Sequence, residues 1–164
     1  MADAKEIRGR LIRCILLPMI LFLTLVSLLL SNQAPASPAR TVTIGVNDTM
    51  QYSVTAIKAK PGETLRVVLQ STSTMPKLAM AHNFVLLAAG TDAAAFVKAG
   101  ANSRETDFVP TAQKAEVLAM SPLVGPAETV EVTFTVPKRK GTYAFICTYP
   151  GHFTLGMKGT LTVQ

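Results

Sequence analysis

A cysteine, a histidine and a methionine lie within eleven residues near the end of the sequence, in Cys147-Thr-Tyr-Pro-Gly-His152-Phe-Thr-Leu-Gly-Met157. The chain has one other histidine, His82, which lies far upstream. A thiolate, two imidazoles and a weakly bound thioether are the donors of a mononuclear copper site that exchanges single electrons. Because no third histidine competes for this role, the sequence predicts a copper site formed by His82, Cys147, His152 and Met157.

Each of these residue types also has an ordinary explanation. A lone buried cysteine usually acts as a small hydrophobic residue, and most methionines fill a core. The copper prediction depends on the four residues together and on the Pro-Gly pair that lets the loop turn sharply. Structural zinc would also accept thiolate and imidazole, but a methionine donor favours copper. The other methionines that follow the N-terminal apolar run are expected in the core or in loops: Met50, Met75, Met80 and Met120.

Two polar residues directly follow predicted ligands. Asn83 follows His82, and Thr148 follows Cys147. A hydrogen bond between these two side chains would tie the two ligand-bearing segments together near the sulfur and hold the ligands in position. An ordinary polar residue at the end of a strand is the alternative explanation for each.

Strands are the predicted scaffold for these residues. Short stretches of apolar and β-branched residues are separated by turn signals, which is typical of a β-sandwich or barrel. A run of good helix formers over 92–100, with Thr91 or Asp92 to cap its start, predicts one short inserted helix. The expected strands cover 41–46, 52–57, 64–69, 82–87, 129–136, 143–147 and 158–163.

An uncharged apolar run extends from Cys14 to Leu30. Basic residues precede it, and this order predicts that the rest of the chain lies outside the cytoplasm. The run is long for a cleaved signal peptide and slightly short for a membrane span, so both remain open, and its length favours an uncleaved anchor. The preceding basic residues are Lys5, Arg8, Arg10 and Arg13.

The sequence therefore predicts three parts. Residues 1–30 form the signal peptide or membrane anchor, 31–40 form a Pro/Ala-rich linker, and 41–164 form the folded domain. The two cysteines fall in the apolar run and in the ligand loop, so no disulfide is expected.

The charge of the chain limits its partners. Residues 37–164 contain 12 Lys and Arg and 8 Asp and Glu, a formal charge of +4. A mild positive excess suits an acidic partner or an anionic membrane surface. The cluster 138–140 is interpreted as a solvated turn between strands, and no aromatic residues interleave it, so nucleic acid is not an expected partner.

Three segments, 81–86, 147–152 and 157–163, resemble azurin-type cupredoxins. Met157 comes five residues after His152, where azurins have four, and this spacing is similar to that of auracyanins. The resemblance implies an all-β, eight-stranded Greek-key β-sandwich with one type 1 copper ion. It also implies one-electron shuttling between membrane redox complexes of a bacterial photosynthetic or respiratory chain. The sequence departs from azurins at Ala81, where azurins have a glycine whose carbonyl approaches the copper.

A monomeric one-electron carrier on the periplasmic side, and not an enzyme, is the function expected. Its redox partners would dock transiently at the loop around His152, and the expected surface consists of Pro150, Gly151, Phe153 and Leu155. A copper enzyme would need further histidine-rich copper sites, for which no histidine is left. The alternative is a periplasmic copper store or chaperone, although such proteins favour more open, thiol- or thioether-rich Cu(I) sites.

Overall fold

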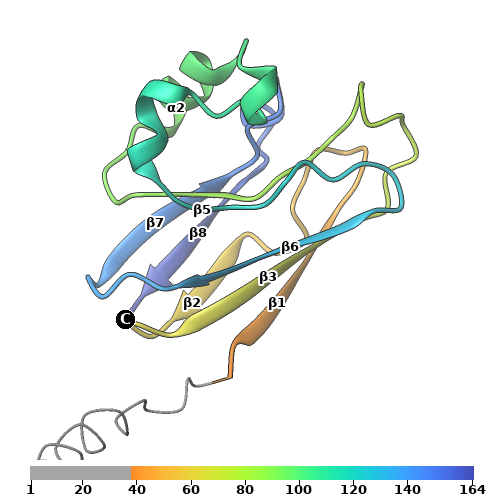
Figure 1. The fold of residues 1–164 in the computed structure, drawn as a ribbon. Coiled ribbons are helices and arrows are strands. Elements are labelled where there is room, and N and C mark those ends of the chain that lie inside the picture. The colour runs from red at the N-terminus through yellow and green to blue at the C-terminus, as the bar shows by residue number, and fades with distance from the viewer. Residues whose placement is uncertain (1–37) are drawn as a thin grey trace, which may run out of the picture. The chain divides into compact units, whose positions relative to one another are not determined.

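The structure is a computed structural model that describes residues 38–164; the predicted apolar segment and most of the predicted linker lie outside the described residues. The described part of the chain forms two β-sheets with helical segments at one end (Figure 1). Its strands are β1 (Arg40–Val46), β2 (Ala56–Ala59), β3 (Thr64–Ser71), β4 (Val85–Leu87), β5 (Val117–Met120), β6 (Thr129–Thr135), β7 (Gly141–Ile146) and β8 (Lys158–Val163). Its helices are α2 (Ala93–Gly100) and the 3₁₀ helices η1 (Arg104–Thr106) and η2 (Thr111–Glu116).

One sheet has three strands in the order β1-β3-β6, and the other has five in the order β2-β8-β7-β4-β5. β1 pairs with β3 and β2 pairs with β8 in parallel, while the other pairs are antiparallel. The chain crosses repeatedly from one sheet to the other, so each sheet contains strands from both the earlier and the later part of the domain's sequence. The predicted eight-stranded Greek-key β-sandwich with one short inserted helix is confirmed.

The main core lies between the two sheets. In β3, Leu65, Val67 and Leu69 are fully buried, and they alternate with polar or more exposed residues as a strand with one face in a core requires. Phe84 and Phe145 stack in the same core, with ring centroids 5.1 Å apart. A side chain at Gly159 would collide with the Phe145 ring, since an added Cβ would lie 2.1 Å from Phe145 Cζ.

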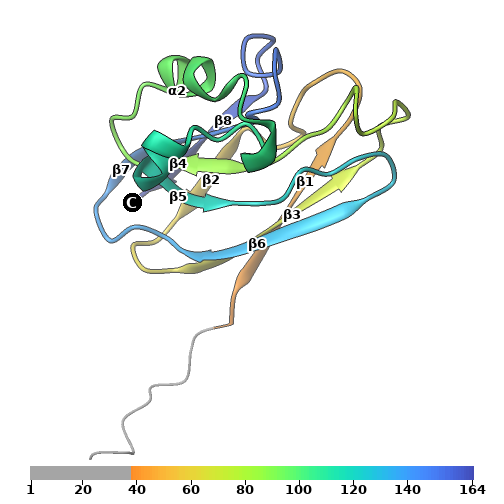
Figure 2. The same ribbon diagram turned by 45° about the horizontal axis from the view of Figure 1, so that its top comes forward.

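A second, smaller core lies under α2. Asp92 caps the helix, because its carboxylate accepts hydrogen bonds from the backbone N–H groups of Ala94 and Ala95 at 3.0 and 3.1 Å. Phe96 is fully buried in one cluster with Val85, Leu87 and Ile146. The helix therefore covers the outer face of the five-stranded sheet (Figure 2), which explains why all three residues of β4 are buried.

The structure differs most from the predicted strands at three places, and the other strand bounds differ by at most two residues. β5 was not predicted, because its short sequence Val-Leu-Ala-Met has no alternation and pairs only with β4. The predicted strand 82–87 is regular only over Val85–Leu87, and His82 forms an isolated bridge with Val124. The predicted strand 52–57 begins only at Ala56, since Tyr52 forms an isolated bridge with Val46.

None of the helices within residues 38–164 is both long enough and apolar enough to cross a lipid bilayer.

Candidate metal centre

His82, Cys147 and His152 converge at one end of the sandwich. The donor atoms of the three side chains all lie within 4.8 Å of one another. The Cys147 Sγ atom is 3.5 Å from His152 Nδ1, and the two imidazole rings are 4.9 Å apart between centroids. His82 and Cys147 are fully buried, and His152 is 2% exposed. The structure thus brings together three of the four predicted ligands from two distant segments.

Backbone hydrogen bonds fix the His82 side of the centre. His82 donates its N–H to the Val124 carbonyl at 3.0 Å, and Val124 donates back to the His82 carbonyl at 2.7 Å. The two exchanged bonds hold the histidine backbone at the end of the sheet although no regular strand passes through it. These bonds therefore hold the backbone of His82 in place beside the metal centre.

The loop between β7 and β8 supplies the other side. Its start and end are joined by the backbone bond from the Cys147 N–H to the Met157 carbonyl at 3.2 Å. Within it, His152 donates to the Tyr149 carbonyl at 3.1 Å, and Met157 donates to the His152 carbonyl at 3.0 Å. Gly151 has a φ of 86°, a left-handed conformation that glycine tolerates best, as expected from the Pro-Gly turn. Met157 is fully buried and belongs to the same core cluster as Cys147.

Asn83 and Thr148 bond to each other twice. The Asn83 amide donates to Thr148 Oγ1 at 2.8 Å, and the Thr148 backbone N–H donates to Asn83 Oδ1 at 2.9 Å. The Thr148 hydroxyl in turn donates to the Asp107 carbonyl at 2.7 Å. Both side chains are almost completely buried, so this reciprocal pair joins the two ligand-bearing segments away from water.

Burial shifts the pKa of all three donor groups. It raises the pKa of the Cys147 thiol to about 12, although hydrogen bonds from the backbone of Asn83 and Tyr149 act in the opposite direction. Burial lowers the pKa of His82 to about 4, and burial together with the neighbouring His82 lowers that of His152 to about 4. Both imidazoles are therefore neutral at pH 7, with lone pairs to offer, and the thiol keeps its proton until a metal ion replaces it.

The free donor atoms fit a copper ion. His82 Nε2 already has a partner, Ser73 Oγ at 3.1 Å, whereas His82 Nδ1 is buried with no hydrogen-bond partner. An unpartnered buried nitrogen costs free energy, and the ring of His82 lies in the group of donors that are within 4.8 Å of one another. One soft sulfur and two imidazole nitrogens are donors that copper accepts in both of its biological oxidation states.

The four residues predicted to surround the loop histidine differ in exposure. Pro150 and Gly151 are exposed, and Leu155 is 56% exposed. Phe153 is only partly exposed, because it packs against the small core under α2 and Lys158 Nζ lies 4.9 Å from its ring centroid. Three of the four thus present open surface beside His152.

Three residues that contact this centre were missed. Ser73 binds the His82 ring, Asp107 binds Thr148 through its carbonyl, and the Tyr52 hydroxyl donates to the Asn83 carbonyl at 2.5 Å. Ser73 lies in a run of serines and threonines, and nothing in the sequence distinguishes it from its neighbours. Asp107 acts through its backbone carbonyl, a group that every residue has. Tyr52 is the first residue of the expected strand 52–57, where a tyrosine usually signals only packing.

Comparisons with known proteins agree with this geometry. The family of copper-binding proteins described as the plastocyanin/azurin family matches residues 39–164. Auracyanin-B of Chloroflexus aurantiacus is 36% identical over 135 residues, which are 81% of this chain and 56% of that protein. Azurin of Pseudomonas aeruginosa is 37% identical over 146 residues, which are 87% of this chain and 97% of that protein. The chain thus spans only about half the length of auracyanin-B but nearly all of azurin.

Solved structures show the same relationship. Auracyanin A, a "blue" copper protein from Chloroflexus aurantiacus, has a TM-score of 0.68 at 34% identity, covering 77% of this chain and 100% of that one. Reduced auracyanin from the photosynthetic bacterium Roseiflexus castenholzii has a TM-score of 0.67 at 33% identity, covering 77% of this chain and 99% of that one. The predicted resemblance is confirmed: the chain belongs to the plastocyanin/azurin family of copper-binding proteins, and His82, Cys147 and His152 form its copper-binding site.

Proposed function

We propose that this domain carries single electrons between redox proteins, with His82, Cys147, His152 and Met157 as the copper ligands. The observation that carries the proposal is the convergence of three buried donor atoms within 4.8 Å. A copper ion bound there supplies a one-electron couple between Cu(I) and Cu(II). The residues of the chain supply a dry and rigid enclosure, in which little has to move when the charge changes.

Met157 is the proposed fourth ligand. Its backbone is hydrogen-bonded to both Cys147 and His152, and its side chain is fully buried. A thioether is a weak donor, so it leaves the three stronger donors to set the geometry. Asn83 and Thr148 are proposed to hold the Cys147 segment against the His82 segment through their reciprocal hydrogen bonds.

Redox partners are proposed to dock transiently at the loop around His152, with the domain as a monomer. Pro150, Gly151, Phe153 and Leu155 form the proposed docking surface, and the exposed Leu155 is its largest apolar projection. A small apolar surface supports a weak contact that dissociates quickly, as a shuttle requires. An enzymatic role is not proposed, because both histidines of the chain belong to the metal centre and no further histidine remains for a second copper site.

An extracytoplasmic location on the periplasmic side, with the N-terminal segment as a membrane anchor or a cleaved signal, is part of the same proposal. The charge order before the apolar run supports export. The likeness to auracyanins of photosynthetic bacteria supports membrane complexes of a photosynthetic or respiratory chain as the partners.

The test is to add Cu(II) to residues 37–164 and record the visible absorption and electron paramagnetic resonance spectra. An intense blue thiolate-to-copper band with narrow parallel hyperfine splitting is expected, and Cys147→Ser should abolish it. Met157→Leu should keep a thiolate band but change the reduction potential. A colourless protein that binds only Cu(I) would contradict the carrier function and would support a copper store or chaperone.

A further inference from the structure

Unpaired basic side chains gather at one end of the domain. Lys58 and Lys60 lie in and just after β2, and the segment 138–140, Lys-Arg-Lys, is the turn that connects β6 with β7. All five residues are exposed, and none of them takes part in the ion pairs found within residues 38–164. Close by, Arg40 pairs with Glu63 at 2.6 Å and donates to the Lys58 carbonyl at 2.7 Å.

Backbone contacts show that these segments form one surface. Gly62 donates to the Val136 carbonyl at 3.1 Å, and Val136 donates to the Glu63 carbonyl at 2.8 Å, so the turn after β2 touches the end of β6. Ala59 and Gly141 flank the same residue of β8, Val163, from its two sides. A cleft of about 600 Å³ opens beside β2, and its lining includes Arg40, Lys58, Lys60 and the acidic Glu63. We name this surface the basic end: Arg40, Lys58, Lys60, Lys138, Arg139 and Lys140.

The basic end accounts for the whole positive excess of the domain. It consists of six of the basic residues of the described region, and one acidic residue, Glu63, lies among them. The rest of the region holds six basic and seven acidic residues. A solvated turn explains why 138–140 is exposed, but it does not explain why two segments distant in the sequence, 58–60 and 138–140, place their unpaired cations together beside Arg40.

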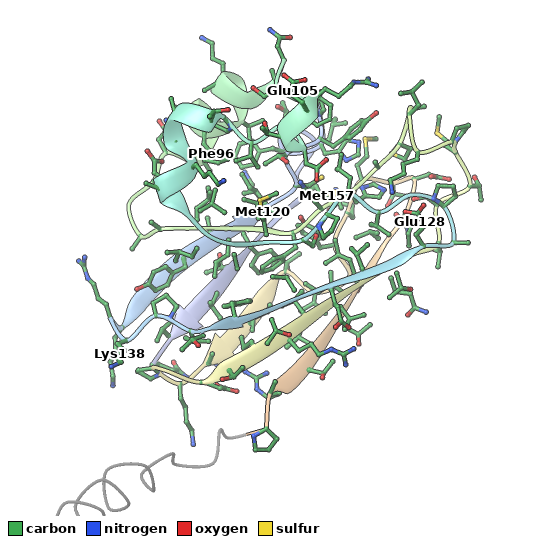
Figure 3. All side chains as sticks on the ribbon, viewed as in Figure 1. Phe96, Glu105, Met120, Glu128, Lys138 and Met157 are labelled. Carbon is green, nitrogen blue, oxygen red and sulfur yellow. The ribbon has the colours of Figure 1, made fainter. Side chains whose placement is uncertain are left out.

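The basic end and the copper centre lie at opposite ends of β7. The turn 138–140 directly precedes the first residue of β7, Gly141, and Cys147 directly follows its last residue, Ile146. A strand of this length separates its two ends by about 20 Å. Figure 3 labels Lys138 at one end of the domain and Met157 toward the other. A partner bound at the basic end would therefore leave the copper centre free.

We propose that the basic end binds the anionic lipid headgroups of a membrane surface and turns the copper centre toward the solution. The exposed large apolar residues of the described region, Met75, Leu78, Leu118 and Leu155, all lie outside the segments that form this end, so it lacks the apolar centre of a protein interface. The described chain also begins here, at residues 38–40. In the sequence, Leu30 precedes Arg40 by ten residues, and even a fully extended chain of that length spans at most about 35 Å.

Vesicle sedimentation with residues 37–164 tests the proposal. The solved chain of auracyanin A matches over its whole length and covers 77% of this chain. That structure supports the expectation that a domain of this extent folds alone. The domain should sediment with phosphatidylcholine vesicles that contain phosphatidylglycerol, should not sediment with pure phosphatidylcholine, and should be released by salt. The triple variant Lys138→Gln, Arg139→Gln, Lys140→Gln should bind about 100-fold more weakly.

A matched triple variant, Lys98→Gln, Arg104→Gln, Lys114→Gln, removes the same charge from exposed sites outside the basic end. It should change the affinity by less than about threefold. Equal losses in the two variants would show a mere net-charge effect and would overturn the proposal, as would no binding to the anionic vesicles. Binding to a polyglutamate peptide without binding to vesicles would assign the basic end to an acidic protein instead. The measurement omits residues 1–36 and needs no copper, so its outcome is separate from those of the anchor and carrier proposals.

Discussion

The Nε2 atom of His82 lies 3.1 Å from the Oγ atom of Ser73, which comes nine residues earlier in the chain. Both residues are buried, with Ser73 5% exposed and His82 fully buried. A metal ion bound at His82 Nδ1, the nitrogen without a partner, requires the ring proton on Nε2, and Ser73 Oγ can accept a hydrogen bond from it. We expect Ser73 to stabilise this tautomer, in which Nδ1 can bind a metal ion.

Removal of this hydroxyl should weaken copper binding. Ser73→Ala leaves the Nε2–H group buried without a partner and lets the ring rotate or change tautomer, so the affinity should fall about 10- to 100-fold. Competition with a copper chelator measures it. Nitrogen NMR of the metal-free protein should also show a mixture of His82 tautomers.

Ser121→Ala is the matched control, because Ser121 Oγ is buried and accepts a hydrogen bond from the Phe84 backbone at 3.0 Å without touching a ligand. It should lower stability but keep the affinity for copper. Equal losses of affinity in both variants would show that the Ser73 effect comes from general destabilisation.

The reciprocal pair Asn83–Thr148 should contribute to stability even without metal. Thr148→Val keeps the shape of the side chain but removes the oxygen that accepts from the Asn83 amide. The free energy of unfolding should fall by about 1–3 kcal/mol, because a buried amide loses its main partner. Urea titration of the metal-free protein measures this change. Thr148→Ser keeps the hydroxyl, and a loss as large as that of the valine variant would refute the hydrogen-bond explanation.

The metal-free protein should be most stable between about pH 6.5 and 9. The folded pKa of His82 and of His152, about 4, lies below the ordinary value of 6.5, so the unfolded chain binds more protons as the pH falls from 6.5 to 4. Folding stability is therefore lost over that range, by at most about 3 kcal/mol for each histidine. The folded pKa of Cys147, about 12, lies above its ordinary 9, so stability is also lost as the pH rises above 9.

Thermal melting of the metal-free protein as a function of pH measures both limbs. Cys147→Ser should keep the acidic limb and lose the part of the alkaline limb that begins near pH 9. The buried Tyr52, whose pKa is also raised, should still cause a decline above pH 10. An unchanged alkaline limb in the variant would contradict the assignment to the thiol.

Leu155→Glu should slow electron exchange while copper stays bound. Leu155 is 56% exposed beside His152, so a charge there disfavours docking of an apolar partner surface. A decrease of at least about fivefold in the second-order rate is expected, as for the loss of about 1 kcal/mol. Stopped-flow mixing with an oxidised redox partner measures it. Leu118→Glu adds the same charge at a 42% exposed leucine on β5 and should leave the rate unchanged; equal slowing would place the docking surface elsewhere.

Much of the sandwich could be predicted from the sequence, because alternation and turn residues are local signals. Thr129–Thr135 alternates as expected, and Asp92 caps the predicted helix. β5 could not be predicted in the same way, because it is an edge strand held by pairing with β4 and by packing under α2. Its structure depends on contacts distant in the sequence, which no local pattern records.

The metal centre was predictable for a different reason. Thiolate and imidazole are rare in this chain, so His82, Cys147 and His152 stood out by residue type alone. The residues that support these ligands did not stand out, since Ser73 acts through a common hydroxyl and Asp107 through its backbone carbonyl. The free Nδ1 atom of His82 also required the three-dimensional structure, because the sequence does not say which ring nitrogen is already bonded.

The positions of the ligands in the sequence affect how strongly copper can stabilise the fold. Cys147 and His152 are five residues apart in one loop, whereas His82 joins them only when β4 pairs with β7 and Asn83 bonds to Thr148, 65 residues away in the sequence. An unfolded chain therefore keeps a local thiol–imidazole pair that binds copper by itself. Any affinity of the unfolded state for the metal subtracts from the stabilisation of the folded state. Copper should thus raise the melting temperature by less than its affinity for the folded domain alone would give, and it should remain on the chain after the sandwich has opened.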